Sequence, residues 1–209
     1  AFCRNQCLEY LRIKENNWIE YMIMVDADGV CTEVTQEMIQ NCLNIKNWSA
    51  ITANVNGFYY DIYALRHTDW CPDDCLVNYA NKKNILKFSQ FDSLRSAVLS
   101  KMIRIEPYRD LIKVDSAFGG LAIYKKSAIP NDAKYSGYNQ SNIEVSEHVP
   151  FNKKINDCFA NSIFIDPKLI IGKSPYEHTR YAGIKGLIIF RIKCLIKNLI
   201  KIIKKNKQF

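Results

Sequence analysis

The residues with the clearest chemical potential are two aspartates one residue apart, Asp26 and Asp28. They directly follow an apolar run at residues 21–25, and Gly29 after them lets the backbone turn freely. In an extended segment this spacing puts both side chains on the same side of the backbone. Two carboxylates held so close repel each other unless a positive charge lies between them. The pattern therefore predicts a divalent metal site completed by phosphate oxygens, and the alternative is an ordinary acidic turn.

The elements around this pair indicate an α/β fold with a mostly parallel sheet. The run at residues 21–25 predicts a strand buried on both faces, and the carboxyl ends of such strands are where α/β sheets place ligands. Further strands are predicted from short apolar runs at residues 49–53, 111–114, 121–124, 143–145 and 162–165. The last of these is expected to stop at Asp166 and Pro167.

Helices are predicted where apolar residues recur at spacings of three and four. They cover residues 1–14, 35–45, 91–105 and 149–157. Thr35 has the residue type and position of an N-cap. The polar stretches at residues 54–84 and 131–142 are predicted to be irregular, and long irregular loops in a compact domain are usually functional or disordered.

A series of short motifs resembles GT-A fold glycosyltransferases, in particular capsule-type (cryptococcal mannosyltransferase-like) enzymes and related bacterial and giant-virus proteins. The motifs are Arg4-Asn5 and residues 21–28, 59–66, 118–124 and 146–149. They occur in the family's order, and the resemblance spans about residues 4–172. It implies a Rossmann-like GT-A fold and transfer of a sugar from a nucleotide-sugar donor to a glycan or lipid-linked acceptor, with Mn²⁺ or Mg²⁺ on Asp26 and Asp28. In this family a strand that binds the nucleoside base precedes this region, so we expect a fragment or an incomplete donor site.

The resemblance also implies roles for residues in the second half of the chain. Glu147 matches the carboxylate that deprotonates the acceptor hydroxyl, and Asp115 is the other candidate catalytic residue. His148 could add an imidazole nitrogen to the metal. Ser116 and the turn Phe118-Gly119-Gly120 are candidate acceptor contacts. The alternatives are that Glu147 caps the following helix, that His148 packs beneath it, and that the glycines form a plain tight turn.

Candidate donor-binding residues lie near the start of the chain and on the tyrosine-rich segment. Arg66 has the fork of donors that suits a diphosphate, and Asp61 could bind a hydroxyl of the donor sugar. The alternative is an ion pair between these two residues. Arg4, Asn5 and Ala27 complete the donor set, although a solvated helix face explains the first two equally well. The segment's aromatic residues either stack on sugars or fill the core: Tyr59, Tyr60, Tyr63 and Trp70.

The charge distribution favours a membrane surface over nucleic acid. The net charge is +8, but residues 185–209 contain eight Lys or Arg and no Asp or Glu, whereas the rest of the chain is balanced. No general basic face for nucleic acid is therefore expected. In the same segment isoleucines and leucines recur at spacings of three and four with lysines on the other side, which predicts a basic amphipathic helix. Such a helix can lie on an anionic membrane, or pack on the body or on a second subunit.

The expected organisation is a catalytic domain at residues 1–180 followed by the basic helix at 181–209. No run of about 20 apolar residues is present, so we expect a protein peripheral to a membrane, in the cytoplasm or, in a eukaryote, the Golgi lumen. The cysteines lack paired CxxC motifs, which argues against zinc, but Cys71 and Cys75 could form a local disulfide, ligate a metal or remain free. A nucleotidyltransferase, which also uses paired carboxylates, and an inactive membrane-surface module are the alternative functions.

Overall fold

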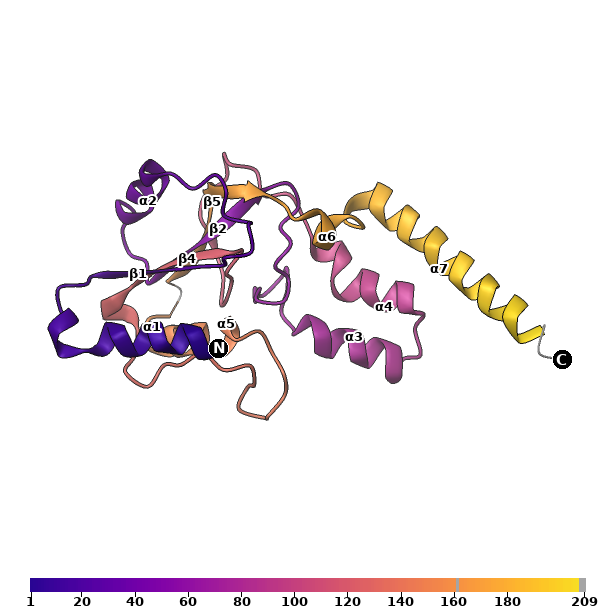
Figure 1. The fold of residues 1–209 in the computed structure, drawn as a ribbon, viewed down its shortest axis with the longest axis horizontal. Helices are drawn as coiled ribbons and strands as arrows, with labels where there is room; N and C mark the ends of the chain where they lie inside the picture. The colour runs from indigo at the N-terminus through magenta and orange to yellow at the C-terminus, as the bar shows by residue number, and fades with distance from the viewer. Residues whose placement is uncertain (161, 207–209) are drawn as a thin grey trace.

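A computed structural model describes residues 1–160 and 162–206 as an α/β body from which a long C-terminal helix extends (Figure 1). The described residues form one mixed five-stranded sheet with the order β1-β4-β2-β5-β3. Its strands are β1 (Tyr21–Val25), β2 (Ala50–Asn56), β3 (Ile112–Lys113), β4 (Leu121–Lys125) and β5 (Ile163–Lys173). The predicted α/β class is confirmed, and β1 has the predicted bounds.

The prediction of a mostly parallel sheet is wrong. Only β2 and β5 pair in parallel, whereas β1 with β4, β2 with β4, and β3 with β5 are antiparallel. An apolar run indicates that a strand is buried but not which way its neighbours run, so the sequence pattern could not show that β4 enters between β1 and β2 in the opposite direction. Because β1 and β2 are both antiparallel to β4, the strands β1, β2 and β5 still share one direction. Their carboxyl ends therefore lie at the same edge.

Helices cover both faces of the sheet (Figure 1). On one face α1 (Phe2–Arg12) and α5 (His148–Cys158) contribute to a core that contains Leu8, Leu11, Phe151 and Ile155. On the other face α2 (Gln36–Leu43) contributes to a second core with Cys42, Trp48 and Ile51. Thr35 caps α2 as predicted, since its hydroxyl accepts a hydrogen bond from the Met38 N–H at 3.2 Å.

The remaining helices lie beside the sheet. They are α3 (Cys75–Asn84), α4 (Gln90–Ala97), α6 (Tyr176–Thr179) and α7 (Gly183–Asn206), with short 3₁₀ turns at η1 (Lys14–Asn16), η2 (Leu99–Lys101) and η3 (Lys126–Ala128). The α3 helix lies inside the stretch predicted to be irregular. It is started by Asp74, whose carboxylate accepts from the N–H groups of Leu76 and Val77. The helix predicted over residues 91–105 ends earlier, because α4 gives way to η2.

Three strand predictions differ from the structure. β1 is an outer strand, and its Ile23 and Val25 are each 45% exposed, so it is not buried on both faces. β5 runs past Pro167 to Lys173, with extra residues bulging out between the residues that pair with Thr52 and Asn54. A proline fits there because a bulge leaves its nitrogen outside the ladder. The strand expected at residues 143–145 is reduced to a single bridge between Tyr138 and Glu144.

The structure also bears on the membrane and cysteine predictions. None of the helices within the described residues combines the length and the hydrophobicity needed to cross a bilayer. All eight cysteines, which lie in the described part of the chain, are free thiols. Cys71 and Cys75 are buried, and burial raises the pKa of both thiols, to about 12 for Cys75.

Candidate active site

Three loops meet at the edge of the sheet where β1 and β2 end and β4 begins. The loop after β1 is tied to the turn before β4 by a hydrogen bond of 2.9 Å from the Asp26 N–H to the Gly120 carbonyl. That turn is tied to the segment after β2, because the Gly119 N–H donates to the Asp61 carboxylate at 2.9 Å. The shared strand direction thus places three of the sequence motifs side by side.

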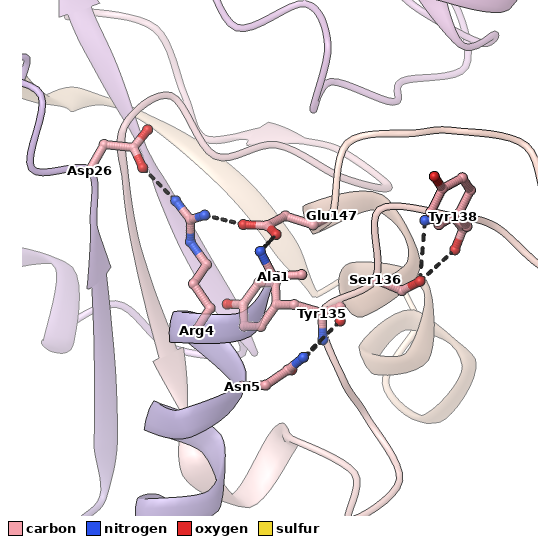
Figure 2. A network of polar contacts seen from close by, with 8 residues as sticks. All are labelled: Ala1, Arg4, Asn5, Asp26, Tyr135, Ser136, Tyr138 and Glu147. Carbon is pink, nitrogen blue, oxygen red and sulfur yellow. Dashed lines mark hydrogen bonds and ion pairs between the residues drawn. The ribbon is translucent and has the colours of Figure 1, made fainter.

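Arg4 joins this edge to α5 (Figure 2). Its guanidinium donates through one Nη to the Asp26 carboxylate and through the other to the Glu147 carboxylate. The group also lies over the Phe118 ring, 5.2 Å from the centroid. The second Glu147 oxygen contacts the amino group of Ala1. Arg4 is therefore not on a solvated helix face, and the predicted metal-binding and catalytic carboxylates lie on either side of one cation.

Negative charge accumulates around Asp26. Burial raises the pKa of Asp26, the Arg4 guanidinium opposes the increase, and Asp28 and Asp61 add to it. Asp28 is exposed, and one of its oxygens accepts from the Val30 N–H at 3.2 Å. Burial, Asp26 and Asp28 also raise the pKa of the Cys31 thiol. An added cation would relieve this excess, since it favours the charged form of nearby carboxylates.

The predicted metal ligands come from different surroundings. Asp26 and Asp28 stand at the edge with the exposed Ala27 between them. His148 is buried, stacks on Phe118 with ring centroids 3.8 Å apart, and has an Nδ1 without a partner among the described residues. Burial and Arg4 hold the pKa of His148 well below its usual range. Within residues 1–160 and 162–206 no three His, Cys, Asp or Glu side chains form a metal-binding group. A cation on the aspartates would take its other ligands from phosphate or water.

The two glycines of the turn have a packing role. Both have positive φ, +68° for Gly119 and +96° for Gly120. A Cβ at Gly119 would lie 2.6 Å from the Ala53 carbonyl oxygen, and one at Gly120 would lie 3.0 Å from the Tyr60 hydroxyl. Any larger residue would push the turn away from β2. The close approach of the turn to the sheet therefore explains why glycine occupies both positions.

Asp61 and Arg66 each bind groups other than one another. Asp61 accepts from the N–H groups of Gly119 and Ala64, and burial raises its pKa against these hydrogen bonds. Arg66 pairs with Asp74 and donates to the carbonyls of Tyr63 and Leu65. Both side chains therefore stabilise the segment after β2. Its aromatic residues also pack internally, with the rings of Tyr59 and Trp70 5.4 Å apart.

The side-chain amides of Asn5 and Asn152 anchor loop segments against α1 and α5. The Asn5 side chain exchanges two hydrogen bonds with the Tyr135 backbone, of 2.8 and 2.9 Å, which anchors the loop at residues 131–142 (Figure 2). The buried Asn152 amide donates to the Ser116 hydroxyl at 3.0 Å and to the Ala117 carbonyl at 3.1 Å. Sequence analysis missed Asn152, because an asparagine on a predicted helix resembles a solvent-facing residue.

Asp115 and Glu147 differ in exposure, since the Glu147 side chain is only 16% exposed. Asp115 is exposed, and its carbonyl accepts from the Asn156 side chain at 2.7 Å. Glu147 stands at the N-cap position of α5 but makes no side-chain capping bond within the described helix, because it is turned towards Arg4. A hollow of about 540 Å³ lies nearby, and Val149, two residues after Glu147, is part of its lining. Its lining includes Lys134, Ser136, Tyr138, Val149, Pro150 and Lys153.

Comparison with known proteins adds no relatives: no protein-family model, curated protein or solved structure matches the chain. The function is therefore argued from the geometry of the site.

Proposed function

We propose that this protein is a metal-dependent glycosyltransferase of the GT-A type that transfers a sugar from a nucleotide donor to a glycan or lipid-linked acceptor. The observation that carries the proposal is the convergence of Asp26 and Glu147 on the Arg4 guanidinium at the carboxyl edge of β1. Sequence analysis assigned these carboxylates to the two halves of such a site. Their closeness is what transfer between a donor and an acceptor requires.

The donor diphosphate would bind at the loop after β1. Asp26 and Asp28 are hard oxygen ligands that fit Mn²⁺ or Mg²⁺. Burial, with Asp28 and Asp61, raises the pKa of Asp26 in spite of Arg4, so a second cation would stabilise its charged form. When bound, the metal would screen the charge that grows on the leaving diphosphate. Arg4 lies against Asp26, which supports a contact between its guanidinium and the same phosphates.

The acceptor would approach from the α5 side. Glu147 would take the proton of the acceptor hydroxyl while that oxygen bonds to the anomeric carbon and the bond from this carbon to the diphosphate oxygen breaks. The products are a glycoside and a nucleoside diphosphate, with the proton on Glu147. This role belongs to an inverting transfer. The hollow beside Val149 and Pro150 supplies polar side chains, among them Ser136 and Tyr138, for acceptor hydroxyls.

The binding step can be tested by calorimetry. The wild-type protein is titrated with uridine and guanosine diphosphates, with and without Mn²⁺, beside Asp28→Asn and the control Asp110→Asn, which alters another exposed aspartate. We expect Mn²⁺-dependent binding by the wild type and the control only. Absence of such binding for every nucleotide would overturn the donor site.

The reaction is tested separately by incubating the protein with a panel of nucleotide sugars and identifying the products. A glycosyltransferase releases a nucleoside diphosphate, whereas a nucleotidyltransferase forms or consumes pyrophosphate. Release of pyrophosphate would replace the proposed activity with the second one. Absence of both metal-dependent nucleotide binding and turnover would favour the inactive membrane-surface module.

A further inference from the structure

The long helix α7 packs on the body with one narrow side. Phe190 is 8% exposed, and its ring lies 5.5 Å from Phe91 and 4.7 Å from Tyr181. Leu187 and Cys194, three and four residues away, pack against the same core. This spacing places the three side chains on one face of the helix. The C-terminal part of α7 extends away from the body (Figure 1).

The opposite side of α7 carries an apolar stripe that faces away from the body. We call it the outer stripe, and its members are between 52% and 59% exposed: Ile188, Ile192, Leu195, Ile196, Leu199 and Ile203. Ile192 follows Phe190 by two residues, about 200° around the helix, so the packed face and the outer stripe lie back to back. The structure therefore excludes packing of the outer stripe on its own body. Contiguous apolar surface of this extent marks an interaction site.

The charges on α7 identify the partner. Arg191 and Lys193 are exposed on the two sides of the outer stripe, whereas Lys197 lies on the side of the helix that faces the body. No Asp or Glu follows Glu177 in the chain. Two copies of α7 joined through their outer stripes would bring these cations together without a carboxylate on either helix to pair with them. An anionic lipid surface provides both apolar chains for the stripe and negative headgroups for the flanking cations.

We propose that the outer stripe of α7 inserts into the headgroup region of an anionic membrane, so that the helix lies in the plane of the surface. The helix is about 36 Å long at 1.5 Å per residue over its 24 residues. Because the Phe190 side faces the body, the body lies on the side of α7 that is turned away from the membrane. This inference goes beyond the proposed transferase activity and holds whether or not the protein is an enzyme.

The test is co-sedimentation of the full chain with two kinds of vesicle, phosphatidylcholine alone and phosphatidylcholine mixed with phosphatidylglycerol. We expect binding to the mixed vesicles that falls as salt is raised, because salt screens the lysines and arginines. The double variant Ile192→Asp/Leu195→Asp removes two stripe residues and adds two negative charges. Its partition to the mixed vesicles should fall at least about tenfold, because two aliphatic side chains no longer leave water.

A matched control separates the stripe from charge alone. Trp18→Asp/Tyr108→Asp makes the same change in charge at side chains that are 75% and 83% exposed but lie in turns outside α7. It should bind vesicles nearly as well as the wild type. Equal binding to both vesicle types, binding retained by the stripe variant, or equal loss in the control would overturn the proposal. A third outcome would assign the stripe to a second copy of the chain instead: the wild type sediments as a dimer, the stripe variant sediments as a monomer, and neither binds vesicles.

Discussion

Asp26 and Glu147, which are 121 residues apart in the chain, bind the two sides of the Arg4 guanidinium. Asp26 directly follows β1, Glu147 is the N-cap residue of α5, and Arg4 reaches between them from α1. The Arg4 guanidinium thus neutralises two carboxylates that the fold brings together. The same arrangement fits a site in which a donor's metal-bound diphosphate and an acceptor meet.

Removal of this shared cation should destabilise the fold. In Arg4→Met the apolar stem is kept, but two partly buried carboxylates lose their partner. We expect the free energy of unfolding in urea to fall by about 1–3 kcal/mol at pH 7. Arg12→Met on the same helix is a control, although its guanidinium also donates to the carbonyls of Pro130 and Ala133. A loss no larger than that of the control would show that Arg4 does not hold the site together.

Replacement of Asp26 should have the opposite effect in the absence of ligand. The raised pKa of Asp26 means that the folded state holds this proton more tightly than the unfolded state. Stability is therefore lost as pH rises from the unfolded pKa of about 3.9 through the higher folded pKa. Asp26→Asn cannot ionise, so at pH 7 it should be more stable than the wild type, and the difference should vanish well below pH 4.

Thermal unfolding of both proteins across this pH range measures the effect, with Asp110→Asn as the control. Mn²⁺ and a bound nucleotide should reverse the order at pH 7, because a ligand that binds only the wild type stabilises only the wild type. If Asp26→Asn is less stable than the wild type at neutral pH without ligand, the pKa of Asp26 is not raised in the folded protein.

Local features of the site were predictable from sequence, and its long-range pairings were not. The strand at residues 21–25, the two aspartates and the glycine turn each lie within one short segment of the chain. Strand periodicity and residue type therefore reveal them. The antiparallel entry of β4 and the contact of Arg4 with Glu147 join segments far apart in the chain, and one sequence contains no signal for such pairs. Asn152 shows the same limit, since its partners Ser116 and Ala117 lie more than 30 residues away.

The Gly119 turn offers a test of the packing at the edge of the sheet where β2 ends and β4 begins. Gly119→Ala forces a Cβ against the Ala53 carbonyl at a φ of +68°, so we expect a loss of about 1–3 kcal/mol in the free energy of unfolding. Gly137→Ala is a matched control, because a Cβ there meets nothing within 4 Å and its φ lies outside the left-handed region. It should change stability by at most about 1 kcal/mol, and in the stabilising direction. Similar denaturation midpoints for the two variants would show that the turn is not pressed against β2.

Glu147→Gln tests the acceptor half of the site with a side chain of the same size. The amide keeps an oxygen for Arg4 but cannot accept the acceptor's proton, so kcat should fall by about 10²–10⁴-fold. Mn²⁺-dependent nucleotide affinity should be nearly unchanged, because Glu147 lies on the acceptor side of Arg4. Glu144→Gln, an exposed carboxylate three residues earlier, should leave kcat unaffected. Unchanged kcat in Glu147→Gln, or an equal loss in both variants, would remove Glu147 from the proposed proton transfer and leave it a structural partner of Arg4.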